Sequence, residues 1–545
     1  MNINWLKYRK NLRGRDPLGV QAINIHLYSL LVPGITNVTD RLRYYSFFPW
    51  VLKLYKDENI KLDFVPFLRR AEFLFSVITT YHHINEPSWS GHMVGTMVMG
   101  QATSELTVNK KIVLSKYTSL EESNQRYFKN RLGGFGQYYL GVLIANGILD
   151  RKGNLEFALY PRGLELANAF VSGNSKDTFI TCVLNDKVTA KELDIMKDDL
   201  CACNLKRNSS EYKLLSEFLK GQDDPYVRES TYKRRDSLAL MFLLLEQTEK
   251  TTDYWELLNA LYYGVSDNNK KIKIPAGLTE TATLWKYYVQ HEFFSMALLS
   301  LFVSAQHLLD DNGLVNSEIG ARLWERYLLN CNPDELQASL KPCLIKLKKN
   351  PTLSEFIGYL DSVYAIDKAW DKDALSEISI SKFLDNKQFP PDSLLVGGLV
   401  LLSLVIRAIK DEQGEPQGIN FKGIFSQYPI NLSKLRKDYN DRWHKMKIFE
   451  VVHELVMEYI LNRHIEVAVR KLYTEGLATF RFLREDNIYR HSEIEYDYVG
   501  NTSPRLRESL QMMADLKIVN EAKEGFSIID KDIGTKYFHE VISGA

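Results

Sequence analysis

The sequence has few of the features that would assign it to a class of chemistry. Its five cysteines, among 545 residues, are an odd number, and no second close pair matches Cys201-x-Cys203. They therefore exclude a disulfide framework, lack the spacing of a metal site and favour a reduced, cytoplasmic protein. The other three cysteines stand at positions 182, 331 and 343.

Long hydrophobic runs are also missing. The basic N-terminus is not followed by the apolar core of a signal peptide. The most apolar segment, Leu394–Ile409, contains Arg407 and is too short to span a membrane, so it predicts a buried helix. We therefore expect no membrane among the partners.

The net charge is close to zero, at +1, so the field of the whole molecule will not attract nucleic acid, and any such binding has to be local. Apolar residues make up 45% and charged residues 25%, which is typical of a globular protein rather than a disordered one. The length allows roughly two to four domains.

Hydrophobic residues recur at helical spacing through most of the chain. The expected fold class is therefore mostly α, a multi-domain helical body with two winged-helix-like modules that carry small β wings. A single helix from about Tyr439 to Lys471 is expected to feed directly into the second module, and Pro342 should kink or divide the fourth helix of the body. Helices are expected at 64–81, 234–247, 285–309, 319–329, 336–347 and 393–410.

The segment Leu31–Trp50, LVPGITNVTDRLRYYSFFPW, is expected to organise the chain. Pro33-Gly34 predicts a turn, and Asn37 predicts a helix N-cap with Asp40 three residues later. Large side chains then line both flanks of the expected helix, so the helix should be buried on both flanks and kinked at Pro49.

Two arginines fall within this apolar pattern. A buried guanidinium needs a paired partner, so Arg41 and Arg43 should meet carboxylates or helix-end carbonyls. Together with Tyr44 and Trp50 they are interpreted as structural residues.

Two stretches predict the order helix, strand, turn, strand, helix, which is the outline of a winged helix. The first has strands at 148–150 and 157–160, and the second has strands at 518–519 and 526–529. The chain is accordingly divided into an N-terminal helical region (1–123), a first module (124–170), a helical body (171–435), and a long helix with the second module (436–545).

Charge distinguishes the two modules. Residues 124–170 carry six positive and three negative side chains, whereas residues 501–545 carry six positive and seven negative ones. The first module is therefore the one expected to contact DNA weakly through phosphates, and the second should bind protein. The candidate phosphate contacts are Lys129, Arg131, Arg151 and Lys152.

No motif predicts catalysis, a metal or a cofactor. Gly133-Gly134-x-Gly136 could cradle a phosphate, but it lacks the residues of a P-loop, and a tight turn into a helix is favoured. His82, His83 and His92 could approach one another in a loop, although few carboxylates are nearby. His453-Glu454 and His291-Glu292 lack the second histidine of a zinc protease motif, and His453 and His464 lie too far apart for one ion.

The motif Pro33-Gly34-x-Thr36, followed by Arg41-x-Arg43-Tyr44-x-x-Phe47-x-Pro49-Trp50, resembles the N-terminal signature of large proteins from bacterial antiphage defence islands. The stretches Trp285–Leu298 and Arg463–Phe482 share its character. In size and style the chain resembles the B component of Druantia-type systems. The resemblance implies work beside a very large helicase and supplies no catalytic residues.

The expected function is therefore that of a non-catalytic component of an antiphage defence system, which bridges partner proteins, among them a helicase, and contacts DNA weakly. Two alternatives remain open at this point. One is a hydrolase or nuclease whose site is assembled only in space, and the other is a winged-helix transcriptional regulator.

Overall fold

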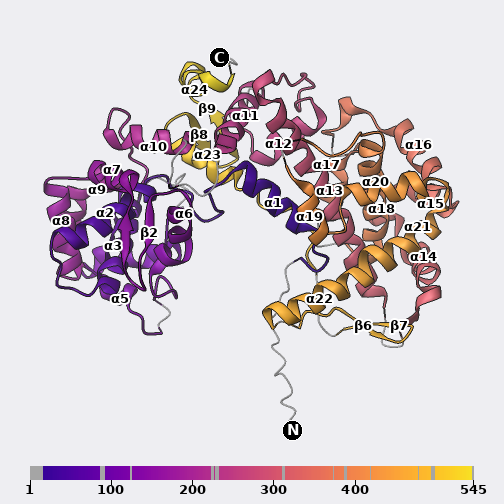
Figure 1. Cartoon of the computed structure of the whole chain (residues 1–545), viewed down its shortest axis with the longest axis horizontal. Helices are drawn as coiled ribbons and strands as arrows, with labels where there is room; N and C mark the ends of the chain where they lie inside the picture. Colours follow the sequence, from indigo (N-terminus) through magenta and orange to yellow (C-terminus); the bar gives the residue numbers. More distant parts are fainter. Residues whose placement is uncertain are drawn as a thin grey trace, which may run out of the picture. The chain divides into compact units, whose positions relative to one another are not determined.

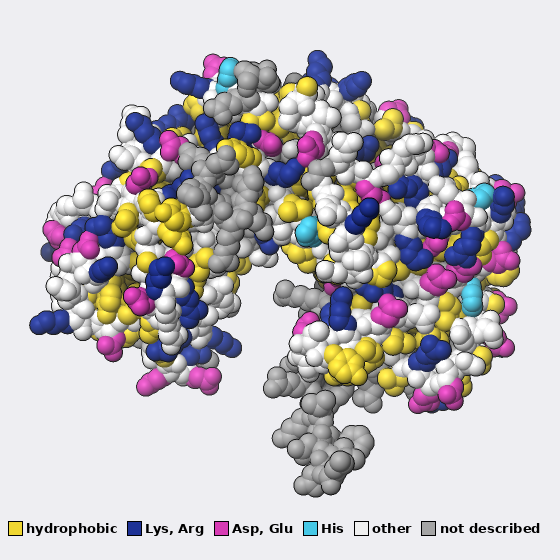
Figure 2. Space-filling model, in the orientation of Figure 1, with side chains coloured by type: hydrophobic (Ala, Val, Ile, Leu, Met, Phe, Trp, Pro, Cys, Tyr) yellow, Lys and Arg dark blue, Asp and Glu magenta, His cyan; other side chains and the backbone are white. Residues whose placement is uncertain are grey.

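The computed structural model describes residues 16–85, 93–122, 125–221, 226, 232–248, 250–309, 313–371, 373–385, 389–417, 419–476, 478–492 and 497–542 (Figure 1). Helix accounts for 63% of the chain and strand for 7%, so the mostly α fold class is confirmed. On the face drawn in Figure 2, basic and acidic side chains are intermixed over the surface.

The chain forms two compact units, each built from segments that are distant in the sequence. Unit 1 comprises Met1–Leu27, Leu258–Lys271 and Thr283–Thr502, and unit 2 comprises Tyr28–Leu257, Ile272–Ala282 and Ser503–Ala545. The domain boundaries expected after residues 170 and 435 do not coincide with a boundary between these units. The division into four regions stays a prediction. Three helices belong partly to each unit: α1 (Gln21–Leu31), α12 (Tyr254–Tyr263) and α13 (Thr279–Leu308).

Unit 2 is a cluster of helices with three antiparallel pairs of short strands. Its helices are α2 (Tyr44–Asp57), α3 (Phe64–His82), α4 (Thr96–Val108), α5 (Leu114–Thr118), η1 (Phe135–Tyr139), α6 (Leu140–Ala145), α7 (Pro161–Phe170), α8 (Asn174–Leu184), α9 (Ala190–Leu200), α10 (Ser210–Lys220), α11 (Tyr232–Thr248), η2 (Ala276–Leu278), α23 (Leu506–Asp515), α24 (Lys531–Tyr537) and α25 (His539–Ile542). Its antiparallel strand pairs are β1 (Ile112–Val113) with β4 (Lys187–Val188), β2 (Leu149–Arg151) with β3 (Phe157–Leu159), and β8 (Val519–Ala522) with β9 (Gly525–Ile528).

The helix of the organising segment, α2, lies in the core of unit 2. It packs against α7 and α3, and Figure 1 shows α7, α8 and α9 around this pair. All its residues from Tyr44 to Leu52 are buried, so the predicted burial on both flanks is confirmed. Phe47 stacks on Phe75 of α3 with ring centroids 4.1 Å apart, and Pro49 lies inside the helix as expected.

The start of α2 differs from the prediction. The helix begins at Tyr44, and Asn37 does not cap it. The main-chain N–H of Leu42 instead donates to the carboxylate of Asp515, 2.9 Å away. Leu42 lies two residues before the first helical residue, so a carboxylate from a distant helix fixes the chain that enters α2, and the N-cap residue Arg43 makes no side-chain cap.

Both predicted helix–hairpin–helix stretches are present in unit 2. The helix before each hairpin ends in the same way, with Gly147 at φ +64° after α6 and Lys517 at φ +58° after α23. The amides of Ile148 and Ile518 then donate back to carbonyls of the preceding helix, at 3.0 Å in both cases. The two hairpins thus follow the same local geometry about 370 residues apart, although their turns differ in length.

Unit 1 is built around α13 and α18 (Pro391–Ile409). By length and composition α18 is the one described helix that could cross a membrane, but 83% of its apolar window is buried in the protein, which confirms the predicted buried helix. The other elements are β5 (Leu314–Val315), η3 (Asn316–Glu318), α14 (Ile319–Asn330), η4 (Pro333–Glu335), α15 (Lys341–Lys348), α16 (Leu353–Val363), η5 (Ile366–Lys368), α17 (Glu377–Leu384), α19 (Phe421–Gln427), α20 (Leu432–Asp441), η6 (Trp443–Lys445), α21 (Ile448–Glu454), η7 (Leu455–Leu461), α22 (Asn462–Glu475), β6 (Phe482–Glu485) and β7 (Ile488–His491).

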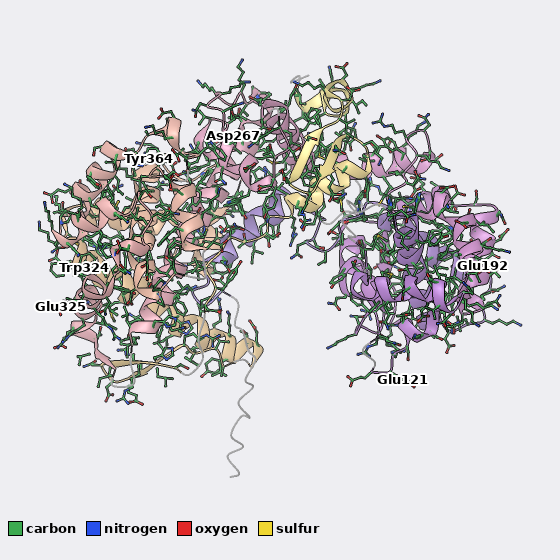
Figure 3. The ribbon with its side chains drawn as sticks, turned by 180° about the vertical axis from the view of Figure 1, so that it is seen from behind. Glu121, Glu192, Asp267, Trp324, Glu325 and Tyr364 are labelled. Atoms are coloured by element: carbon green, nitrogen blue, oxygen red, sulfur yellow. The ribbon has the colours of Figure 1, made fainter. Side chains whose placement is uncertain are left out.

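The core of unit 1 contains one buried polar cluster around Glu377. The hydroxyls of Tyr262 and Tyr263 donate to this carboxylate at 2.9 and 3.2 Å. Arg407 lies 3.4 Å from Glu377 and also covers the ring of Tyr364, which is labelled in Figure 3, at 3.8 Å. The Glu377 carboxylate is therefore paired inside the protein, while the Nε of Arg407 is buried without a hydrogen-bond partner among the described residues.

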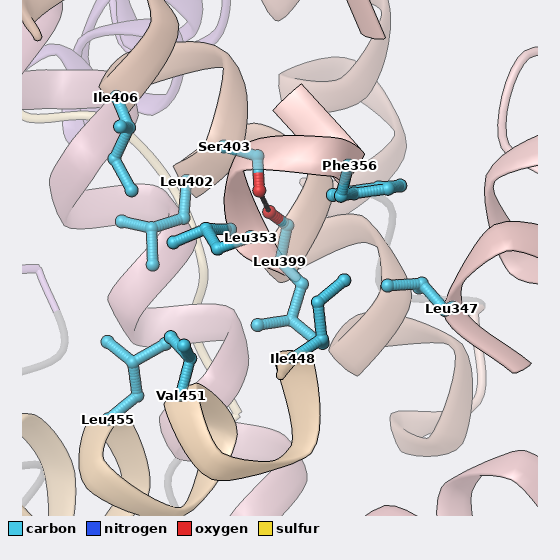
Figure 4. A pocket seen from close by; sticks show the side chains of 10 residues that line it. All are labelled: Leu347, Leu353, Phe356, Leu399, Leu402, Ser403, Ile406, Ile448, Val451 and Leu455. Carbon is cyan, nitrogen blue, oxygen red and sulfur yellow. Dashed lines mark hydrogen bonds between the residues drawn. The ribbon is translucent and has the colours of Figure 1, made fainter. Parts of the chain in front are cut away.

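A small gap lies nearby between α15, α16, α18 and α21 (Figure 4). Nine of its ten lining residues are apolar, and the hydroxyl of Ser403 donates to the carbonyl of Leu399 in its own helix. The gap is thus a feature of core packing and offers no chemistry.

Two further helix predictions need correction. The expected helix from 439 to 471 starts at Ile448, because the chain leaves helical geometry at Arg442 (φ −140°) and is extended at Lys447. It continues to Glu475 and then enters the hairpin β6–β7, not the C-terminal module. The expected helix 336–347 starts at Lys341, so Pro342 lies in its first turn, where proline costs no hydrogen bond.

The close packing of the first hairpin against α7 yields a stability prediction. A Cβ added at Gly163 would lie 2.1 Å from the main-chain oxygen of Ile148, whereas one added at Gly358 of α16 would meet nothing within 4 Å. We expect Gly163→Ala to lower the free energy of unfolding by about 1–3 kcal/mol, because backbone has to move. Gly358→Ala should be neutral or stabilising by up to about 1 kcal/mol. Urea denaturation of both variants measures the difference, and equal stabilities would contradict the packing described.

Candidate functional site

The arginines of the organising segment are buried in unit 2 and bind internal groups. Arg41 donates to Asp515 of α23 at 2.9 Å, and both side chains are at most 3% exposed. Burial raises the pKa of Asp515 to about 6, against the opposing effect of Arg41.

Arg43 has the larger set of partners. Its Nε and Nη2 donate to the two carboxylate oxygens of Glu211 at 3.0 and 2.8 Å, and Ser46 donates to the same carboxylate. Its Nη1 donates to the carbonyls of Asp199 and Cys201 at 2.9 and 2.7 Å, at the C-terminal end of α9. A single guanidinium thus joins α2, α9 and α10.

The turn before α2 is held through its main chain. The carbonyls of Pro33, Gly34 and Ile35 accept hydrogen bonds of 2.8–2.9 Å from side chains of other elements. The donors are Arg234 of α11, Asn146 at the end of the first module's helix and Arg505 before α23. The segment therefore ties both helix–hairpin–helix modules to the core of unit 2.

Two aromatic residues of the motif, Tyr44 and Trp50, lie in the same core. The hydroxyl of Tyr44 is 3.2 Å from that of Ser76, and it accepts the amide of Val94 at 3.2 Å. Trp50 packs against Phe170 and Phe179 with ring centroids about 5 Å apart. Both residues contribute packing area to the core.

The glycine-rich loop already binds an internal carboxyl group. The carboxylate of Glu72 accepts the amides of Gly134 and Phe135 at 2.9 and 2.7 Å, and the hydroxyl of Tyr127 at 2.6 Å. A Cβ on Gly133 would lie 2.3 Å from this carboxylate. The glycines thus admit a buried side chain at the position where a phosphate was considered.

A pocket of about 350 Å³ lies between the organising segment and the loop 127–139. Four aromatic side chains line it, and Asp40 contributes a carboxylate. The aromatic residues are Tyr127, Phe128, Tyr138 and Tyr139. Asn37 and Thr96 add further polar groups to walls that are otherwise mostly apolar, and the volume fits a small planar ligand.

The four basic residues proposed for phosphate contact are all exposed. Lys129 and Arg131 directly follow the pocket residue Phe128 in the chain. Arg151 folds back on its own turn and donates to the carbonyls of Gly153 and Asn154, and Lys152 forms a 2.7 Å ion pair with Asp150. Since these contacts are exposed, a phosphate can replace them at little cost.

Two of the histidines considered as ligands have structural partners, and a third is buried and neutral. His464 is buried, with Nδ1 3.0 Å from the carbonyl of Pro17 and Nε2 accepting the amide of Arg481 at 2.8 Å. His453 accepts the amide of Gly320 at 3.2 Å. His291 is fully buried, and burial lowers its pKa to about 3, so it is neutral at pH 7.

The remaining histidine pair lies beside cysteines, a proximity that no sequence pattern predicted. Ligand atoms of His82, His83 and Cys201 all lie within 4.8 Å of one another. His92, the third histidine considered from the sequence, lies outside the described residues. The sequence signals for this cluster, an adjacent histidine pair and Cys201-x-Cys203, are more than a hundred residues apart.

Sequence reasoning also missed the buried acids that bind the two arginines and the glycine-rich loop. Glu72, Glu211 and Asp515 are buried, at 3% exposure or less. The one signal that could have found them is their position on the apolar faces of helices, where an acid requires a donor.

No protein-family model matches the chain, and comparisons with curated proteins and with solved structures find no significant match.

The partners of Arg43 predict a large loss of stability when it is removed. Arg43→Ala leaves Glu211 buried without its guanidinium and should lower the free energy of unfolding by about 3–5 kcal/mol. Lys53→Ala removes an exposed partner from the same helix, α2, and should change it by less than about 1 kcal/mol. Chemical denaturation of both variants tests this. An Arg43→Ala protein of unchanged stability would show that the buried network does not hold the unit together.

Glu72 predicts a pH dependence. Burial raises its pKa to about 7, although three donors and the nearby Arg69 favour the ionised form. The folded state therefore binds this proton more tightly than the unfolded chain, and the associated stability is present below about pH 4.5 and is lost as pH rises to 7.

Glu72→Gln keeps an acceptor but cannot titrate. Between pH 5 and 7, the unfolding free energy of the variant should fall less steeply with pH than that of the wild type, by up to about 1.4 kcal/mol per pH unit. Urea titrations at several pH values measure both slopes. Parallel slopes would mean that Glu72 is ionised throughout this range.

Proposed function

We propose that this chain is a non-catalytic component of an antiphage defence assembly, which binds partner proteins, among them a large helicase, and contacts nucleic acid weakly. The resemblance of Pro33–Trp50 to defence-island proteins supports the defence role. The structure contributes a supporting observation: the charged groups of that motif are engaged inside unit 2. The two arginines of the motif are thus used to build the scaffold and are not available for chemistry on a substrate.

The nucleic-acid contact rests on the aromatic pocket and its basic neighbours. Tyrosine and phenylalanine rings bind unpaired bases by stacking, and a carboxylate such as Asp40 accepts a hydrogen bond from an exocyclic amino group. Lys129 and Arg131, which follow Phe128, are suited to the adjoining phosphates. An unpaired nucleobase with its flanking phosphates is therefore the ligand that the pocket favours.

We interpret both helix–hairpin–helix modules as winged helices with different tasks. The wing turn of the first module, with Arg151 and Lys152, is exposed. The hairpin of the second module is covered along β9, where Phe526 and Thr252 exchange two main-chain hydrogen bonds of 2.9 Å. The second wing bears Glu521 and Glu524, and we assign this acidic module to protein contacts.

A cytoplasmic location belongs to the same proposal. It is supported by the five cysteines, all of which carry free thiols.

The proposal predicts weak, salt-sensitive binding of nucleic acid. Each neutralised phosphate changes the slope of log K against log salt by roughly −0.9 on duplex DNA, so four contacts give a slope of about −3 to −4. Two double variants test this: Arg151→Glu with Lys152→Glu, and Lys129→Glu with Arg131→Glu. Each should reduce the magnitude of the slope of log K against log salt by about two. Fluorescence titration of labelled single-stranded and duplex DNA against salt measures it.

The pocket and the second wing supply the controls. Tyr138→Leu should weaken binding of single-stranded DNA by about 1–3 kcal/mol with little change in the salt slope, because it removes stacking and no charge. Glu521→Gln with Glu524→Gln should leave DNA binding unchanged. No binding at low salt, or equal losses from both wings, would remove nucleic acid from the proposed function.

A further inference from the structure

A second cluster in unit 2 has the composition of a metal centre. The Sγ of Cys201 lies 3.3 Å from the Nε2 of His83, and His82 also places a ligand atom within 4.8 Å of both. Around tetrahedral zinc, a thiolate sulfur and an imidazole nitrogen are separated by about 3.5 Å. The widest spacing in the cluster therefore needs to shorten by only about an ångström.

Cys203 supplies a further thiol beside this cluster. It follows Cys201 by two residues, and its thiol interacts with the Cys201 thiol and the His83 ring. Cys203 is therefore placed to complete a four-ligand set around an ion bound by His82, His83 and Cys201.

The cluster lies where two helices end. His82 is the last residue of α3, and His83 follows it. Cys201 follows the last residue of α9, which packs against α3 and starts with a capping box at Glu192, labelled in Figure 3. Because helix C-termini carry partial negative charge, both helices stabilise a cation at this point.

Neighbouring groups hold the two ligand segments in place. Arg43 donates to the carbonyl of Cys201 at 2.7 Å, and the amide of Ala202 donates to Thr79 of α3 at 2.9 Å. Asp198 lies 3.9 Å from the Nε2 of His82, as an outer carboxylate does beside a metal-bound imidazole. The ligands are thus positioned by the arginine that holds the core together.

Hydrogen bonding within the protein does not account for the whole cluster. The Nδ1 of His82 is buried, and it finds no hydrogen-bond partner among the described residues. A satisfied core histidine, such as His464, uses both ring nitrogens. The Nε2 of His291 is likewise buried without a partner among the described residues, so the metal assignment depends on the ligand atoms of His83 and Cys201 beside His82.

We propose that His82, His83, Cys201 and Cys203 bind one zinc ion. Two imidazoles and two thiolates form a Cys₂His₂ set, which zinc takes in tetrahedral structural sites. Such an ion would join the end of α3 to the segment after α9, and it requires no open coordination position. The role is structural and adds no reaction to the proposed function.

The test uses the purified full chain, reduced and stripped of metal with a chelator. Zinc should bind at about one ion per chain, and Co²⁺ should give the absorption bands of tetrahedral cobalt–thiolate coordination. Both signals should be lost in Cys201→Ser, and the charge-transfer band should weaken in Cys203→Ser. Cys331→Ser changes a buried cysteine of unit 1 and is the matched control, which should bind as the wild type does.

Thermal unfolding gives an independent measurement. Zinc should raise the Tm of the wild type and of Cys331→Ser, but not that of Cys201→Ser. His82→Asn changes a side chain that is 26% exposed, and it tests the site if Cys201→Ser does not fold. Wild-type protein that binds neither ion, or variants that bind as well as the control, would overturn the proposal.

Discussion

The bidentate pairing of Arg43 with Glu211 is the interaction on which unit 2 depends. The guanidinium is 2% exposed and uses its donors on one carboxylate and two main-chain carbonyls. Removing a charge of either sign from water costs several kcal/mol, and here the cost is offset because every bond is formed inside the protein. Removal of either residue would therefore leave the charge of the other buried and unpaired.

The same logic recurs through the unit, where internal side chains occupy positions that could have held a ligand. Glu72 accepts the amides of the glycine-rich loop, as a bound phosphate would. Asp515 takes the amide at the start of α2 together with the guanidinium of Arg41. Features that in isolation suggest substrate binding are used here to join segments from distant parts of the chain.

The buried side chains that bind one another form the scaffold, and partners have to bind at other surfaces. The aromatic pocket near Asp40 and the histidine–cysteine cluster adjoin the network without being filled by it. Arg43 links the network to the cluster, since it binds the carbonyl of Cys201. A change in the core is therefore transmitted directly to the proposed zinc ligands, and a bound ion would in turn stabilise the core.

The sequence by itself determined the local elements of this protein. The periodicity of apolar residues located α3, α11, α14 and α18 to within two residues at each end, and it missed the first six residues of α13. Turn residues located both hairpins, because these signals act over a few neighbours. The burial of α2 and the need of its arginines for partners followed from the same pattern.

Only the tertiary structure decided which groups meet. Asp515 lies more than 470 residues from Arg41, and Cys201 lies 118 residues from His83, so no local pattern pairs them. The approach to α2 has the same origin, since the amide of Leu42, two residues before the helix, is bound by a carboxylate of another helix. Long-range partners are chosen by the packing of whole helices, and a single sequence records the residues of such a site but not their proximity.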